Sequence, residues 1–249
     1  FVLGAPEFVV KELGAKVNEI VTENAKNGYR VVMLAHSPLE ISGDKIPVCR
    51  PVSLLVIEDH IRPEAPEVIR WFKENNVDVR IISGDNPITV AEVARRVGVA
   101  GTDKYVSLEG MSKTEVINIA NKYNVFGRVT PEQKALLIKT IKSNGHTVAM
   151  TGDGVNDILA MKESDCSITV ATGSDATKNI AHIVLMDNNF NSIPHVVAEG
   201  RRVINNIEKS SSLFLMKTIF TMVLAIISII GGSLFPFRSN MMTLSLIHI

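Results

Sequence analysis

The chain has 249 residues, of which 46% are hydrophobic, and its 26 basic and 26 acidic side chains balance to a formal net charge of zero. This is enough apolar material for a sizeable core. Because the charge is balanced and the sequence has no basic stripe with interleaved aromatic residues, nucleic acid is not the expected partner. Cys49 and Cys166 lack the C-x-x-C spacing of a zinc or redox site, so we expect two buried thiols in a reducing compartment.

Taken in chain order, the first fifty residues differ from the rest, and their turn-rich stretch "SPLEISGDKIPVCRP", residues 37–51, is expected to be a loop between a separate N-terminal piece and the sheet. From residue 52 short apolar runs alternate with helical periods. The predicted strands are 52–57, 77–83, 124–129, 146–150, 166–170 and 182–186, and the predicted helices are 64–76, 88–98, 113–123, 132–145 and a short one from residue 155. This alternation, with near-continuous apolar strands, is typical of an α/β chain with a parallel sheet covered on both faces.

Three polar clusters follow predicted strands: "SGDN" at 83–86, "VTPEQK" at 129–134 and "TGDGVND" at 151–157. Open parallel sheets bind ligands beyond the carboxyl ends of their strands. We therefore expect the three clusters to converge at one edge of the sheet.

The cluster at 151–157 places Asp153 and Asp157 four residues apart across a strand-to-helix turn, with glycines that remove side chains where an anion would approach the backbone. Magnesium takes oxygen ligands and is commonly shared with a substrate phosphate, so this pattern predicts Asp153 as a ligand of Mg²⁺. Carboxylates and glycine are also ordinary turn chemistry, which is the alternative for this loop taken alone.

Two further side chains are expected at the same edge of the sheet, and their proposed roles depend on the acidic pair there. The hydroxyl of Ser83 is placed to donate to phosphoryl oxygens, although serine and glycine after a strand are usually only a turn. Lys134 lies one turn inside a helix that starts near Pro131, where most lysines are solvated. With the acidic pair, its ammonium would balance the charge of a phosphorylated carboxylate, as phosphoryl transfer requires.

The C-terminal part departs from a soluble pattern. An amphipathic helix over 192–217 leads into "TIFTMVLAIISIIGGSLFPF", residues 218–237, which contains no charge and has the length of a transmembrane helix. The alternative is a buried core helix. Because no signal peptide pattern precedes this span, we expect the globular part to be cytoplasmic.

The motifs "FVLGAPE", "IEDHIRPEA", "IISGDN", "RVTPEQK" and "TGDGVND", in this order, resemble those of the P-type ATPases, cation pumps of the haloacid dehalogenase superfamily. The resemblance covers the whole chain. It implies a remnant of a nucleotide-binding domain at 1–48, a Rossmann-like phosphorylation domain lacking its first strand at 49–200, a stalk helix at 201–217, a transmembrane helix at 218–237 and the start of the next membrane segment at 238–249.

The resemblance also implies roles for individual residues. Lys134 corresponds to the phosphate-binding lysine, Ser83 to a hydroxyl donor that is usually threonine, Asp153 to the magnesium ligand, and Asn156 and Asp157 to supports of the phosphoryl group and metal. The expected nucleotide-side residues are Gly84, Asp85, Arg30, Asp59 and Arg62. The implied cofactor is Mg²⁺ and the implied substrate is ATP.

Besides Ser83, the chain departs from the family pattern at three places. Leu3 stands where the family has a lysine, His60 and Ile61 replace two prolines between Asp59 and Arg62, and the nucleophile motif Asp-Lys-Thr-Gly-Thr is absent. Asp44 in "GDKIP" does not replace that nucleophile, because no buried strand precedes it. We therefore expect a piece of a longer pump that is inactive alone.

The resemblance implies a multi-pass protein of a bacterial plasma membrane that moves a cation, with calcium favoured by the order "SLFLMKTIF" and soft metals disfavoured by the missing thiols. Lys217 is either a snorkelling interfacial lysine or a cation near a transport path. Two alternatives remain open for the chain: a soluble phosphatase of the same superfamily, and a catalytically dead magnesium- or nucleotide-binding module with a membrane anchor.

Overall fold

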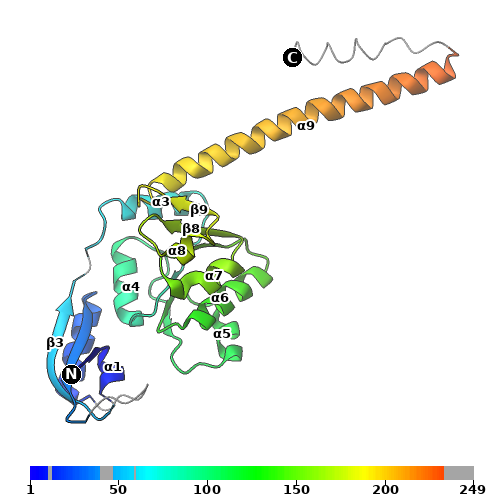
Figure 1. The fold of residues 1–249 in the computed structure, drawn as a ribbon. Helices are drawn as coiled ribbons and strands as arrows, with labels where there is room; N and C mark the ends of the chain where they lie inside the picture. The colour runs from blue at the N-terminus through cyan, green and yellow to red at the C-terminus, as the bar shows by residue number, and fades with distance from the viewer. Residues whose placement is uncertain (11–12, 40–46, 59, 233–249) are drawn as a thin grey trace. The chain divides into compact units, whose positions relative to one another are not determined.

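The computed structural model describes residues 1–10, 13–39, 47–58 and 60–232. The chain divides into two compact units, Phe1–Ser192 and Ile193–Ile249. The first unit combines helices with antiparallel and parallel strands (Figure 1), which confirms the predicted α/β class with parallel sheets.

An antiparallel sheet forms the N-terminal part of the first unit. Its strands, in the order β1-β2-β3, are β1 (Val2–Gly4), β2 (Arg30–His36) and β3 (Arg50–Ile57), and the helices beside them are α1 (Pro6–Val9) and α2 (Ala15–Lys26). Met33 and Ala35 of β2 are fully buried and pack with Val9 and Cys49. The thiol of Cys49 is therefore a core group, as predicted.

The strand predicted at 52–57 exists but belongs to this sheet. We expected it to open the parallel alternation, whereas β3 pairs antiparallel with β2 through Met33 and Leu54. Most of β3 is exposed, including Leu55 at 45% and Ile57 at 44%. An apolar run does not distinguish a buried parallel strand from an edge strand, which is why the prediction failed here. The N-terminal sheet thus extends to Ile57, past the boundary expected at residue 48.

The rest of the first unit holds two parallel sheets instead of the single one expected. The first has the order β4-β6-β5, with β4 (Ile81–Ile82), β5 (Tyr105–Ser107) and β6 (Val125–Gly127). The second has the order β7-β8-β9, with β7 (Ala149–Thr151), β8 (Cys166–Val170) and β9 (Ile183–Leu185). Within the described residues, β4 and β7 are edge strands, each paired with one neighbour only.

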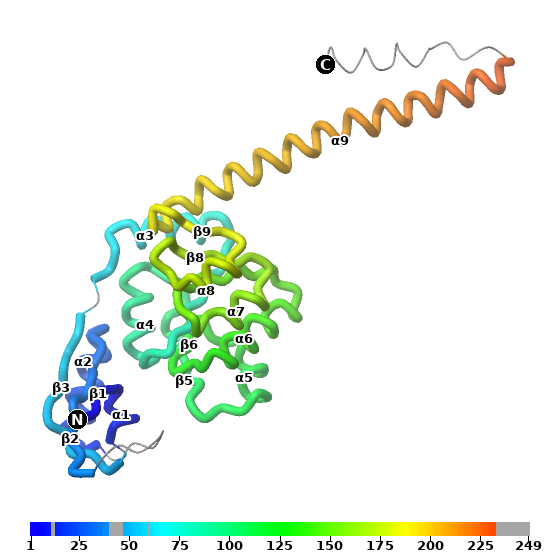
Figure 2. Tube along the Cα trace, in the orientation of Figure 1, coloured from blue at the N-terminus to red at the C-terminus, as the bar shows by residue number. Residues whose placement is uncertain are grey.

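Helices cover the parallel sheets on both faces. They are α3 (Ala65–Glu74), α4 (Pro87–Arg96), α5 (Lys113–Ile119), α6 (Pro131–Ser143), the 3-10 turn η1 (Val155–Asp157), α7 (Ile158–Glu163) and α8 (Asp175–Lys178). Successive strand residues face opposite sides. Val125 of β6 packs against Ala91 and Ala94 of α4, whereas Phe126 packs in the cluster that contains Leu137 of α6. Figure 2 shows α4 and α6 on opposite sides of β6.

The sequence places the start of α6 through its capping residues. Thr130 is the N-cap, its hydroxyl accepts from the N–H of Gln133, and the Gln133 side chain accepts from the N–H of Thr130. Pro131 follows at the first helical position, where its missing N–H costs nothing. This cap fixes the position of Lys134, one residue after Gln133.

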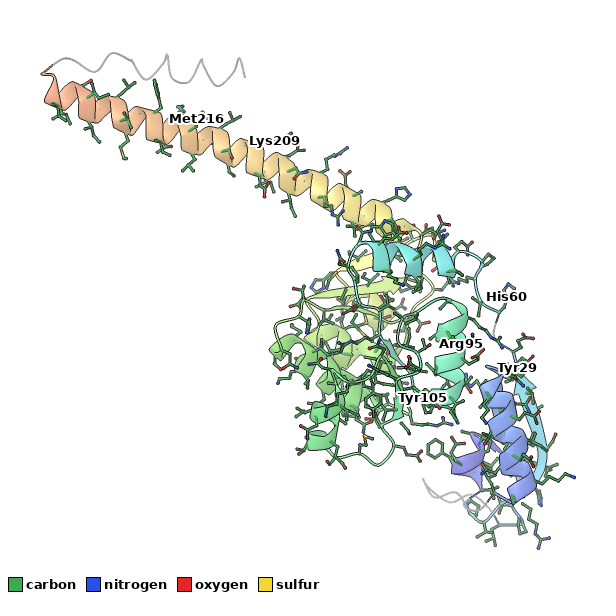
Figure 3. All side chains as sticks on the ribbon, turned by 180° about the vertical axis from the view of Figure 1, so that it is seen from behind. Tyr29, His60, Arg95, Tyr105, Lys209 and Met216 are labelled. Carbon is green, nitrogen blue, oxygen red and sulfur yellow. The ribbon has the colours of Figure 1, made fainter. Side chains whose placement is uncertain are left out.

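The second unit is described by one helix, α9 (Ser192–Ile230), which runs for 39 residues. By length and composition it is able to cross a membrane. Its apolar side chains are exposed, among them Phe214 at 61% and Ile229 at 81%, and Figure 3 shows Lys209 and Met216 projecting from it. The stalk expected at 201–217 and the start of the predicted span are thus one continuous helix, while residues 233–249 lie outside the described part.

Candidate functional site

A buried ion pair joins two of the predicted site residues. Lys134 of α6 places its Nζ 2.7 Å from Oδ1 of Asp157, which ends η1. Their side chains are 12% and 13% exposed, so water screens the pair weakly. The lysine expected to balance a phosphorylated carboxylate is therefore paired with Asp157, and its ammonium is held at the end of η1, the turn that follows β7.

Gly152 makes this arrangement possible. A Cβ at Gly152 would lie only 2.4 Å from the Cβ of Asp157, so any other residue would push the two apart. At Gly154 the corresponding approach to Asp157 Oδ2 is 3.8 Å, an ordinary contact. We expected both glycines to clear space for an anion, but Gly152 clears space for the Asp157 side chain.

Asp153 lies between these glycines and is exposed. Its carbonyl accepts from the N–H of Ser174 at 2.9 Å, while its carboxylate makes no hydrogen bond or ion pair with the described residues. No group of three His, Cys, Asp or Glu side chains in the described part of the chain could hold a metal ion. One available carboxylate does fit magnesium, which typically takes one or two protein carboxylates and completes its shell with water and phosphate. Asn156 is exposed in the same turn.

The loop after β4 holds Ser83, Gly84 and Asp85. The Ser83 Oγ accepts from the N–H of Asp85 at 3.1 Å, and the Ser83 carbonyl accepts from the N–H of Val129 at 3.1 Å. Ile82, the preceding residue, packs in the same cluster as Met150 of β7. Within the described residues no hydrogen bond or ion pair joins Ser83 to Lys134 or Asp153, so its place in a shared site stays a prediction.

Two residues predicted on the nucleotide side pair with each other. Arg30 of β2 places Nη2 3.2 Å from Oδ1 of Asp85, with side chains 54% and 41% exposed. Arg62 instead donates to the carbonyl of Asn188. Asp59 lies outside the described residues.

No sequence pattern indicated a role for Arg128, although it lies in the quoted "RVTPEQK" stretch. Arg128 adopts a φ of 53°. Its guanidinium donates to the carbonyl of Gly84 at 3.1 Å, pairs with Glu7 of α1 and lies 5.2 Å from the ring centre of Phe8. It therefore links the loop after β4 to the N-terminal part of the unit.

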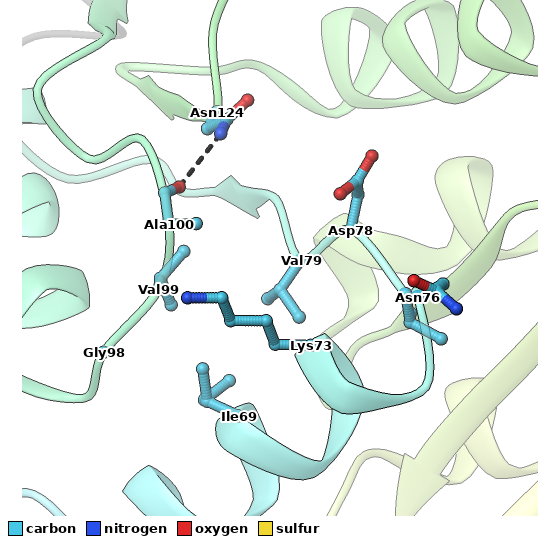
Figure 4. Close-up of a pocket in the computed structure, with 10 residues that line it drawn as sticks. Ile69, Lys73, Asn76, Asp78, Val79, Gly98, Val99, Ala100 and Asn124 are labelled. Carbon is cyan, nitrogen blue, oxygen red and sulfur yellow. Dashed lines mark hydrogen bonds between the residues drawn. The ribbon is translucent and has the colours of Figure 1, made fainter.

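A cavity of about 350 Å³ lies away from these residues (Figure 4). It is lined by the end of α3, including Lys73, and by Val79, which precedes β4, and Asn124, which precedes β6. It is thus at the amino ends of strands whose carboxyl ends carry the predicted site. The Asn124 side chain closes one wall by donating to the carbonyl of Ala100 at 2.9 Å.

Comparison with known proteins places this geometry in a family context. The profile of the haloacid dehalogenase-like hydrolases matches residues 4–165, and a second profile of the same description matches residues 134–197. The chain is 43% identical to the probable cation-transporting ATPase exp7 of Streptococcus pneumoniae over 93% of its length, and 39% identical to the calcium-transporting ATPase CtpE of Mycolicibacterium smegmatis over 98%. It is 30% identical to the putative cation-transporting ATPase MJ1226 of Methanocaldococcus jannaschii over 97%.

The chain spans only 30%, 32% and 31% of these three relatives, respectively. The resemblance to ATPases of the haloacid dehalogenase superfamily, drawn from the motifs, is nevertheless confirmed by the matched regions.

Proposed function

Because this chain belongs to the haloacid dehalogenase-like hydrolases, we propose that it is the phosphorylation segment of a P-type ATPase that couples ATP hydrolysis to cation transport. The observation that carries the proposal is the buried Lys134–Asp157 pair beside the available carboxylate of Asp153. The matches to cation-transporting ATPases support the same reading.

In the proposed reaction an aspartate carboxylate attacks the γ-phosphorus of ATP, a new P–O bond forms, and the bond to the β-phosphate oxygen breaks to release ADP. Water then attacks phosphorus, frees inorganic phosphate and regenerates the carboxylate. Residues 1–249 contain no Asp-Lys-Thr-Gly-Thr motif, so we propose that the acceptor lies outside this sequence and that the chain alone is not phosphorylated.

The proposed roles of the chain's own residues follow from their positions. Asp153 would contribute a carboxylate ligand to Mg²⁺, which when bound offsets the negative charge of the phosphoryl group. Lys134, fixed by Asp157, would supply a positive charge that needs no reorganisation during transfer. Ser83 and Asn156 would donate hydrogen bonds to phosphoryl oxygens.

The proposed substrate contacts lie on the N-terminal side of the first unit. Arg30 is held by Asp85 in the loop after β4, which would place a guanidinium beside the phosphates of ATP. In the same loop, the carbonyl of Gly84 accepts a hydrogen bond from the guanidinium of Arg128, which follows β6. Arg62 and Asp59 would act from the segment before α3. Leu3 is 61% exposed in β1 and supplies no charge to this surface.

We propose calcium as the transported cation because three of the relatives above 38% identity are named calcium-transporting ATPases. α9 would cross the bacterial plasma membrane, with the α/β unit in the cytoplasm. The hydroxyls of Thr218 and Thr221 donate to the carbonyls of Phe214 and Lys217. Their oxygens keep lone pairs, but residues 218–230, the described part of the proposed span, contain no carboxylate, so further ligands would come from other membrane segments.

A chimera tests the proposal directly. In it this chain replaces the matching segment of the Streptococcus pneumoniae relative, which is 43% identical. We expect acid-stable phosphoprotein after incubation with γ-labelled ATP and Mg²⁺, and none from residues 1–249 alone. Asp153→Asn and Lys134→Ala should abolish the label, whereas Asp103→Asn, in an exposed turn, should not. An adduct on the isolated chain, or labelling that survives Asp153→Asn, would contradict it.

A further inference from the structure

The connection from β8 into the first residues of α8, residues 173–177, contacts the backbone of Asp153. The N–H of Ser174 donates to the Asp153 carbonyl at 2.9 Å, and the Thr177 hydroxyl lies 3.3 Å from the same oxygen. These contacts join two segments more than fifteen residues apart in the sequence. Asp153 is therefore fixed through its main chain while its carboxylate stays available.

The loop itself is rigidly built. Thr177 is fully buried at 0% exposure, and its N–H donates to the Ser174 Oγ at 3.2 Å. The Thr177 hydroxyl also lies 2.7 Å from the Ser174 carbonyl. The hydroxyl carries one hydrogen, which lies between the Ser174 carbonyl at 2.7 Å and the Asp153 carbonyl at 3.3 Å, and a buried hydroxyl in such a network resists displacement. The donor that faces Asp153 therefore has little freedom to move.

Gly173 sets how closely the loop approaches. A Cβ at this position would lie 2.8 Å from the Thr169 Oγ1, 3.0 Å from the Val170 carbonyl and 3.2 Å from the Asp153 carbonyl. Two of these three neighbours are backbone atoms, which cannot rotate away. A larger residue would thus move the loop off Asp153 without removing any hydrogen-bonding group.

We propose that Gly173 and Thr177 are positioning residues that orient Asp153 for a divalent cation. Partners outside the first coordination shell fix the direction of ligands and commonly change metal affinity strongly. The inference rests on the proposed metal role of Asp153, and it adds residues from a different strand-to-helix connection that none of the polar clusters in the sequence indicated.

The test measures Mn²⁺ binding by the whole chain, ¹⁵N-labelled and in detergent micelles, through paramagnetic broadening of the Gly154 amide signal. Thr177→Val keeps the side-chain shape, removes the hydroxyl and should weaken binding roughly tenfold. Thr177→Ser restores the hydroxyl and should recover most of the affinity. Gly173→Ala should weaken binding with every donor retained.

Thr140→Val is the matched control. Thr140 is also buried, at 7% exposure, and its hydroxyl donates within α6 to the Leu136 carbonyl at 2.7 Å. Its replacement removes a buried hydroxyl without touching Asp153, so Mn²⁺ affinity should stay at the wild-type value. A purely structural role for Thr177 would make the two valine variants behave alike.

Wild-type affinity in folded Thr177→Val or in folded Gly173→Ala would overturn the inference. If Thr177→Val does not fold, Gly173→Ala decides alone. Broadening at Gly154 that is lost in Asp153→Asn supports the metal role on which the inference rests. Absence of broadening in the wild type would contradict that role, and the positioning inference with it, so the two failures are distinguishable.

Discussion

At the scale of single residues, the ion pair between Lys134 and Asp157 sets the electrostatics of the candidate site. Both side chains are nearly removed from water, at 12% and 13% exposure. Removing one partner of a buried pair leaves the other charge uncompensated, which costs more than the pair itself contributes. The pair therefore couples the stability of the fold to the arrangement of the site.

Lys134→Met should lower the free energy of unfolding by about 3 kcal/mol, because the Asp157 carboxylate would remain buried without its cation. Urea denaturation followed by circular dichroism measures this. Adding Asp157→Leu should recover most of the loss, since no buried charge then remains.

Lys178→Met is the matched control for a surface pair. Lys178 lies 2.8 Å from Asp175, whose side chain is 94% exposed. Pairs exposed to water contribute little to the free energy of unfolding, so this variant should lose far less stability than Lys134→Met. Equal losses for Lys134→Met and Lys178→Met would show that the Lys134 pair is not buried in solution.

Gly152→Ala should destabilise the unit and detach Asp157 from Lys134, because the new Cβ would lie 2.4 Å from the Cβ of Asp157. The expected loss in unfolding free energy is about 2 kcal/mol. Gly14→Ala is the control, since nothing lies within 4 Å of a Cβ there. A Gly152→Ala variant as stable as Gly14→Ala would be incompatible with the described turn.

At the scale of elements, the sequence predicted the helices better than the sheets. Capping residues and C-terminal glycines mark α4 and α6, and Gly98 and Gly145 have φ values of 85° and 88° as helix-ending glycines often do. Strand β5, Tyr105–Ser107, was missed because three residues carry no periodicity. Strand pairing was misassigned at β3, since pairing partners are far apart in the sequence and no local pattern encodes them.

In the candidate site, too, local features could be predicted from the sequence, whereas contacts between distant residues could not. The strand-to-helix turn of Asp153 and Asp157 follows from local sequence. The contacts of Arg128 with Glu7, and of Thr177 with Asp153, arise only from tertiary packing. No spacing rule in the sequence predicts contacts between residues that are 24 and 121 positions apart.

The entry into β7 provides a pH-dependent prediction. The Asp165 carboxylate accepts from the N–H of Val148 at 2.9 Å and lies 3.0 Å from the Nζ of Lys142. The hydrogen bond from Val148, followed by that from Lys142, lowers the pKa of Asp165. The folded state therefore binds fewer protons than the unfolded state. Its added stability is complete above the unfolded pKa of about 3.9 and is lost as pH falls through the lower folded pKa.

Asp165→Asn should accordingly lower the urea midpoint near neutral pH, and the difference from wild type should be smaller at acid pH, below the unfolded pKa of about 3.9, where the wild-type carboxylate loses its charge. Asp103→Asn, in an exposed turn, serves as the control. A difference of equal size at both pH values would mean that the contact with Val148 does not depend on the charge.

At the scale of the whole molecule, α9 is the element that distinguishes the two hypotheses for this chain, a membrane-anchored pump segment and a soluble phosphatase. Many of its apolar side chains are exposed, among them Ile226 at 48% and Ile227 at 57%. A helix of this composition is stable in lipid, where all its backbone groups are satisfied internally.

Ile226→Arg should therefore reduce membrane insertion, because an arginine near the centre of a span costs about 2.5–3.5 kcal/mol. Val203→Arg, in the expected stalk, should have no effect. Carbonate-resistant membrane association of the two variants measures the difference. Equal association would place the helix outside the bilayer and favour the soluble alternative.

The most direct measurement is an experimental structure of the chimera with Mg²⁺ and beryllium fluoride, which mimics a phosphorylated aspartate. We predict that the Asp153 carboxylate enters the magnesium shell, and that the Lys134 Nζ and the Ser83 Oγ lie within hydrogen-bonding distance of the fluorides. A structure in which these three side chains do not border the bound fluoride would contradict the proposed phosphoryl site.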